Sequence, residues 1–129
     1  MTEIPVPKDL RRFILTSVES IPYLEAMLLL RTEYNAPWDA ARLARRLYIS
    51  EKKSADLLRA LQAAGILVFA GQSASSYCYR PASPELGTMI DCLAEFYASH
   101  LVEVTHLVHS KHDKRAEKFA NAFLWRKDS

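Results

Sequence analysis

The sequence predicts a mainly α-helical protein with a small β-hairpin near its middle and long helices toward its C-terminal end. Three observations support this fold class. Apolar residues recur at helical spacing over most of the chain. Residues 66–80 instead show the composition of two short strands separated by a small polar turn. The length of 129 residues suits one compact domain.

Two helices are predicted before residue 35. Leu10, Ile14 and Val18 recur at helical spacing and predict a short helix over residues 8–17. Ser20 is a suitable N-cap for a second helix, and the proline that follows it falls in the first turn, where a missing N–H group is harmless. The Asn-Ala-Pro sequence at residues 35–37 then ends this helix.

Two further helices are predicted on either side of a short turn. Asp39 can cap the first, in which apolar residues form one stripe. Ser50 can cap the second, which spans residues 51–64, and Gly65 stands where a left-handed C-cap is needed. The apolar side chains of this second helix gather on one side and leave its charged side chains on the other.

The hairpin follows directly. Residues 66–70 are rich in β-branched and aromatic residues and predict a strand, and residues 77–80 predict the returning strand. Small polar residues at 71–76 form the turn between them, and Pro81 and Pro84 end the hairpin.

The C-terminal part is predicted to be helical. A long amphipathic pattern over residues 85–110 predicts one helix of about 39 Å. A final helix is predicted over residues 114–125. Charge is unevenly distributed, since residues 81–110 hold four acidic groups and no Lys or Arg, whereas residues 36–65 hold six basic and three acidic groups.

The order of helix, helix, short turn, helix and hairpin resembles that of winged helix-turn-helix proteins, in particular small bacterial regulators of the MarR-like and related kinds. The residues that carry the resemblance are 37–47 (PWDAARLARRL) and 50–67, which include LLRALQAAGIL. The resemblance covers roughly residues 20–80. It implies a winged helix-turn-helix domain with an N-terminal helix over residues 1–80, followed by a C-terminal helical extension over residues 81–129.

The resemblance implies a sequence-specific DNA-binding transcriptional regulator whose partner is double-stranded DNA. The helix at residues 51–64 would lie in the major groove, braced by the preceding helix. Lysines and arginines on phosphates would supply affinity, and Arg59 is placed to bond a guanine edge. The candidate DNA-binding residues are Lys52, Lys53, Arg59, Arg45, Arg46 and Arg42.

A second interpretation stays open. Asp56 lies four residues after Lys52 and three before Arg59, so these charges can form ion pairs on a solvated helix face. The hairpin turn at residues 71–76 contains no Lys or Arg, unlike wings that reach a minor groove. The alternative function is a winged-helix protein–protein interaction module that does not bind DNA.

The apolar stripe in residues 85–110 predicts a homodimer, because a small domain is not expected to cover a seam of about 39 Å by itself. The alternative is that the stripe packs on its own domain. The candidate interface residues are Leu86, Ile90, Leu93, Tyr97, Leu101, Val104 and Leu107.

Other function classes lack support in the sequence. Glu103, His106, His109 and His112 recur every three residues, but each step rotates the side chain by about 60° around a helix, so we expect no metal site and no cofactor. Nucleotide-binding loops, zinc-protease motifs and nucleophile elbows are absent from the sequence, so we expect no enzyme. Without a signal peptide, a membrane span or a disulfide framework, we expect a cytoplasmic protein with no membrane partner.

Overall fold

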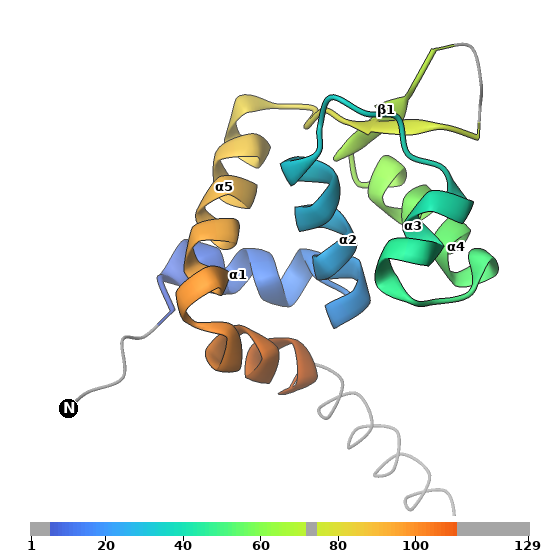
Figure 1. Cartoon of the computed structure of the whole chain (residues 1–129). Helices are drawn as coiled ribbons and strands as arrows, with labels where there is room; N and C mark the ends of the chain where they lie inside the picture. The colour runs from blue at the N-terminus through green and yellow to red at the C-terminus, as the bar shows by residue number, and fades with distance from the viewer. Residues whose placement is uncertain (1–5, 72–74, 111–129) are drawn as a thin grey trace, which may run out of the picture.

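The computed structural model of the chain describes residues 6–71 and 75–110, which are mainly helical and include a small two-stranded antiparallel sheet (Figure 1). This is the fold class that the sequence predicts at its coarsest level. The elements in chain order are α1 (Lys8–Ser17), α2 (Ile21–Thr32), α3 (Ala40–Leu47), α4 (Glu51–Ala63), β1 (Leu67–Phe69), β2 (Tyr77–Tyr79) and α5 (Pro84–Ser99), followed by helical residues 101–110.

The predicted helix caps are confirmed. The side chains of Ser20, Asp39 and Ser50 each accept a hydrogen bond from the backbone N–H of the third residue of the helix that follows. Ser83 caps α5 in the same way. Gly65 adopts φ +82°, the left-handed conformation predicted after α4.

The sheet has a third, very short participant. The strands β1 and β2 pair with Val68 opposite Cys78, and both are slightly shorter than predicted. On the other side of β2, Trp38 and Tyr77 exchange two backbone hydrogen bonds of 2.7 Å. The Trp38 side chain is fully buried, and its indole nitrogen donates to the Glu33 carbonyl. The segment between α2 and α3 is therefore fixed to the hairpin.

Helix α2 lies in the centre of the molecule, with α5 to one side of it and α3 and α4 to the other, while α1 runs across its lower part (Figure 1). Its Leu24, Met27 and Leu30 are fully buried. Buried residues from Leu10 in α1 to Val108 near the end of the described chain belong to one hydrophobic cluster. The described parts of the two predicted regions, residues 1–80 and 81–129, thus share a single core.

The prediction of one helix over residues 85–110 is wrong. α5 ends at Ser99, His100 leaves the helical conformation with φ −134° and ψ 47°, and residues 101–110 form a second helix in a new direction (Figure 1). The His100 ring stacks on Phe96 at a centroid distance of 4.2 Å. The bend places the apolar residues of both helical segments on the chain's own core, so the domain covers this stripe without a second copy.

The bend also determines where the predicted dimer residues lie. Ile90, Leu93 and Val104 are fully buried in the core of the protomer. Leu86, Tyr97 and Leu107 are half-buried against the same core, and Leu101 is exposed. Three of the seven residues therefore offer no surface to a second copy in this structure. The helix predicted over residues 114–125 lies outside the described residues.

Across residues 6–71 and 75–110, no single helix combines the length and apolar character of a membrane span. Only α1 and α2 taken together meet those criteria, and the two helices are bent by 111° relative to each other.

Candidate nucleic-acid interface

The helices α3 and α4 form a firmly joined pair. Ser54 of α4 is fully buried, and its hydroxyl donates a 2.8 Å hydrogen bond to the carbonyl of Ala40 in α3. Leu43 of α3 and Leu58 and Leu61 of α4 are buried in the common core. Since both packing and a buried hydrogen bond join the two helices, they present their outer residues as one surface.

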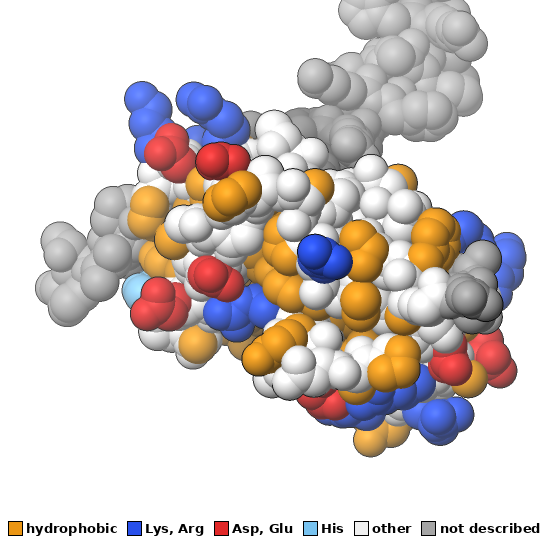
Figure 2. Space-filling model, turned by 90° about the horizontal axis from the view of Figure 1, so that it is seen from above, with side chains coloured by type: hydrophobic (Ala, Val, Ile, Leu, Met, Phe, Trp, Pro, Cys, Tyr) orange, Lys and Arg blue, Asp and Glu red, His pale blue; other side chains and the backbone are white. Residues whose placement is uncertain are grey.

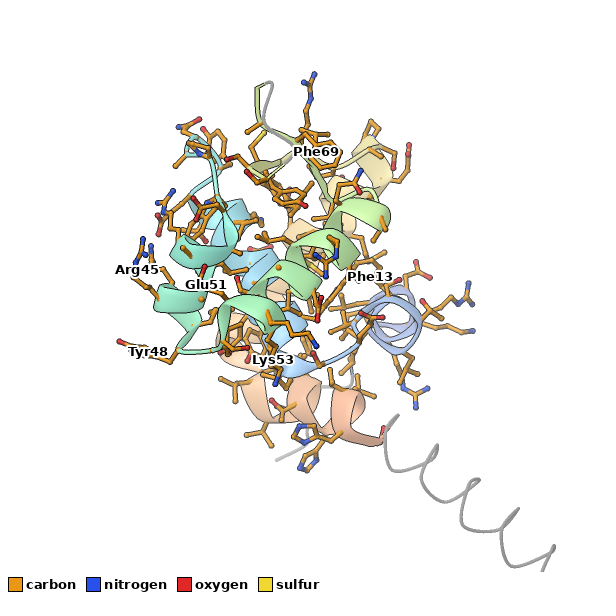
Figure 3. All side chains as sticks on the ribbon, turned by 90° about the vertical axis from the view of Figure 1, so that its right-hand side faces the viewer. Phe13, Arg45, Tyr48, Glu51, Lys53 and Phe69 are labelled. Atoms are coloured by element: carbon orange, nitrogen blue, oxygen red, sulfur yellow. The ribbon has the colours of Figure 1, made fainter. Side chains whose placement is uncertain are left out.

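The turn between these helices exposes a compact set of polar side chains, which we call the α3–α4 surface. Its members are Arg45, Tyr48, Glu51, Lys52 and Lys53. Tyr48 has φ 58° and is 92% exposed, the highest value among the exposed large hydrophobic residues in the described part of the chain. In Figure 3 the side chains of Arg45 and Tyr48 project outward from the body of the molecule.

Two of the six predicted DNA-binding cations are held by one carboxylate. The Oε1 atom of Glu33 accepts from Arg42 at 3.0 Å, and Oε2 pairs with Arg46 at 2.7 Å. The Arg42 guanidinium also donates to the Pro37 carbonyl and lies 3.9 Å from the centroid of the Trp38 ring. Arg42 therefore braces the α2–α3 connection, and its role in the structure is internal.

The same contacts shift the pKa values of both partners. The hydrogen bond from Arg46 lowers the pKa of Glu33, with the charges of Arg46 and Arg42 acting in the same direction against partial desolvation. The hydrogen bond to Glu33 raises the pKa of Arg46. The lowered pKa of Glu33 favours its ionised form, which is the form that holds both arginines.

The remaining cations divide into paired and free ones. Arg59 forms an ion pair with Asp56 on the exposed face of α4, one of the pairings expected under the second interpretation. Arg45, Lys52 and Lys53 form no ion pair with any residue in the described ranges 6–71 and 75–110. All three free cations belong to the α3–α4 surface.

Sequence reasoning missed two residues of this surface, Tyr48 and Glu51. The sequence context of Tyr48 does predict its exposure, because it is an aromatic residue in a short turn between two capped helices, where little chain is available to cover it. A non-glycine residue in the left-handed region is also uncommon, and this position is the only such case in the described chain. Glu51 occupies the first turn of α4, where its charge complements the helix dipole.

The hairpin presents a different kind of surface. Seen from above, hydrophobic side chains gather on the face that carries the hairpin (Figure 2). A groove of about 750 Å³ lies between residues 34–37 and the two strands, with Tyr34, Phe69 and Arg80 among its lining residues. Tyr34 is 58% and Phe69 49% exposed. The tip of the hairpin, residues 72–74, lies outside the described residues.

Metal ligation finds no geometric support in the part of the chain that the structure describes, since no group of three or more His, Cys, Asp or Glu residues is arranged to hold an ion there. His112, the last member of the regularly spaced set, lies outside that part.

Comparisons with known proteins return no match: no family model, no curated protein and no solved structure is significantly similar to the chain.

Proposed function

We propose that the chain is a winged helix-turn-helix transcriptional regulator that binds double-stranded DNA sequence-specifically as a homodimer. The order α2, α3, α4, β1 and β2 supports the winged-helix part of this proposal. The observation that carries the DNA-binding part is the α3–α4 surface. There, three cations without an ion-pair partner in the described part of the chain and an exposed tyrosine lie around the N-terminal end of α4. Recognition helices contact base edges with their N-terminal residues.

Each member of the surface has a chemically suitable role. Arg45 and Lys53 would contact phosphates, which also favour the positive end of the α4 dipole. Lys52 would contact a phosphate or a guanine edge, and Glu51 would accept a hydrogen bond from the amino group of a cytosine. Arg59 would exchange Asp56 for a guanine edge on binding. Arg46 keeps part of its guanidinium exposed and would add a phosphate contact beside Glu33.

The proposed homodimer uses a different surface from the one that the sequence predicts, because several of the predicted interface residues are buried in the protomer core. Leu101, one of the predicted interface residues, and its neighbour Val102 are 55% and 60% exposed at the start of helical residues 101–110. Helix-turn-helix proteins commonly pair so that two recognition helices meet successive half-sites. We expect the double substitution Leu101→Ser with Val102→Ser to shift the protein from dimer to monomer in sedimentation while the circular dichroism spectrum is retained.

A second candidate function is a protein-interaction module. The observation that favours it is the hairpin groove, which exposes Tyr34 and Phe69 on one face. Arg42 and Arg59 are each paired with a carboxylate of the chain, which points the same way, because paired cations have less to offer a phosphate. Under this interpretation the protein would bind no DNA at physiological salt.

Fluorescence anisotropy with a labelled random-sequence duplex separates the two candidates. The double substitution Lys52→Ala with Lys53→Ala should weaken binding and reduce the slope of log affinity against log salt by about 2, since each phosphate contact contributes about 0.9. The matched control is Lys8→Ala with Arg12→Ala, which removes the same charge from exposed positions of α1. Equal binding by both double variants would refute the assignment of the interface.

A further inference from the structure

We propose that the groove between α1 and α5 binds a monovalent organic cation with an aromatic body. The groove has a volume of about 510 Å³, within the usual range for small-molecule sites. Leu10 from α1 and Met89 and Phe96 from α5 form its apolar wall. Asp9 and Glu95 place one carboxylate from each helix on the same groove.

The charges around the groove favour a cation. Lys and Arg are absent from its lining residues. Asp9 and Glu95 have no ion-pair partner among residues 6–71 and 75–110. The nearby Asp91, in contrast, is already paired with Arg31 at 2.8 Å. The groove therefore combines apolar surface with two carboxylates that no ion pair in the described ranges neutralises.

The two carboxylates contribute unequally. Asp9 lies in the first turn of α1, where its charge offsets the positive end of the helix dipole. Glu95 lies near the other end of α5, which ends at Ser99 and whose dipole adds negative rather than positive potential there. Glu95 should therefore provide most of the attraction for a bound cation.

The chemistry of the groove also restricts the kind of cation. A metal ion needs several converging ligands, and no such group exists among the described residues. A strongly hydrated ammonium ion would gain little from the apolar wall. An aromatic cation with delocalised or shielded charge buries apolar surface on Met89 and Phe96 while its charge faces the carboxylates.

This site is independent of the proposed DNA interface. None of the residues that line the groove belongs to the α3–α4 surface, and its ligand binding is measured without DNA. Cys92 is exposed in the groove and provides a direct reporter, because a bound ligand should shield its thiol from alkylation. Cys78, half-buried in β2, serves as an internal reference.

The experiment compares two ions of the same shape and opposite charge, tetraphenylphosphonium and tetraphenylborate, by titration calorimetry on the full chain. We expect saturable binding of the phosphonium ion and slower alkylation of Cys92 by iodoacetamide, with the rate at Cys78 unchanged. Glu95→Gln should weaken phosphonium binding by about two- to fivefold, which is the usual contribution of one exposed charge pair. The same substitution should strengthen borate binding, because it removes a like charge from the groove.

The matched control is Glu85→Gln, which removes the same charge from an exposed position of α5 about 15 Å along the helix from Glu95. It should leave both affinities nearly unchanged. As a second variant, Cys92→Trp should fill the groove from an exposed position and reduce binding of both ions. Absence of phosphonium binding, binding that leaves Cys92 unprotected, or equal effects of Glu95→Gln and Glu85→Gln would each overturn the proposal.

Discussion

Glu33 determines which of the cations in α3 remain available to a partner. Its two carboxylate oxygens engage Arg42 and Arg46, and the indole of Trp38 lies beneath the Arg42 guanidinium. Arg45, between them in sequence, points away and is exposed. A single acidic residue at the end of α2 thus holds two of three neighbouring arginines in ion pairs, while the third forms no ion pair within the described ranges 6–71 and 75–110.

Replacing Glu33 by Gln tests this role through its pH dependence. The pKa of Glu33 is lowered from its usual 4.5, so its charged form stabilises the fold above that value, and the stabilisation is lost as the pH falls through the lowered pKa. We expect Glu33→Gln to be less stable than wild type in urea at neutral pH and the difference to shrink in acid.

The control for this substitution is Glu25→Gln, which changes an exposed carboxylate of the same helix that forms no ion pair with any residue in the ranges 6–71 and 75–110. It should produce a small difference that does not track the titration of Glu33. A stability difference between wild type and Glu33→Gln that stays constant from neutral to acidic pH would contradict the role of the ion pairs.

The sequence could predict some of these side-chain roles and not others. The Asp56–Arg59 pair follows from a spacing of three residues on one helix, which is local information. The pairing of Arg46 with Glu33 depends on how the end of α2 packs beside α3, so no local spacing reveals it. The exposure of Tyr48 follows from its place in a short turn between two capped helices, whereas its left-handed backbone conformation depends on how those helices pack and is not encoded in the local pattern.

At the scale of elements, a buried hydroxyl joins α3 to α4 in addition to their apolar packing. Ser54 is the only buried polar residue in the described part of the chain, and its hydrogen bond to the Ala40 carbonyl joins the two helices. A fixed angle between these helices matters for the proposed function, because α4 must enter a groove while α3 contacts the backbone.

We expect Ser54→Ala to lower the free energy of unfolding by about 1 kcal/mol, the usual net worth of an intramolecular hydrogen bond. Urea denaturation measures this directly. Thr88→Ala is the matched control, because Thr88 is exposed in α5 and its substitution should change stability by no more than about 0.5 kcal/mol. Equal stability of Ser54→Ala and wild type would show that packing alone sets the angle.

Element boundaries are predictable where local chemistry determines them. The caps at Ser20, Asp39 and Ser50 and the left-handed Gly65 are local signals, and they correctly predict three helix starts and one helix end. The break at His100 is not predictable in this way. The helical period continues through it and neither Gly nor Pro marks it, so we attribute the break to tertiary packing, since residues on both sides of it are buried in one core.

At the scale of the whole molecule, the bend at His100 converts the expected intermolecular seam into an internal one. Ile90 and Leu93 on one side of the bend and Val104 and Val108 on the other are fully buried. Burial in a protomer core and burial between two copies have different thermodynamic signatures, because only the second makes stability depend on protein concentration.

Two leucines of the predicted seam therefore should behave differently. Leu93→Ala should lower the free energy of unfolding by about 2–5 kcal/mol, the range for a buried leucine, independently of protein concentration. Leu101→Ala, at a 55% exposed position, should have a much smaller effect on the folding of the protomer. Denaturation curves at two protein concentrations check both statements, and a strongly concentration-dependent loss in Leu93→Ala would place Leu93 at an intermolecular interface instead.

Selection of duplexes from a random-sequence library by the purified protein reports on DNA recognition itself. We expect the wild-type chain to enrich one motif, with two related half-sites about one helical turn apart if two copies bind together. A variant that carries Arg45→Ala, Lys52→Ala and Lys53→Ala should enrich no motif, whereas Lys8→Ala with Arg12→Ala should enrich the wild-type motif. Failure of the wild-type protein to enrich any sequence, or enrichment of the same motif by the triple variant, would contradict DNA reading by the α3–α4 surface.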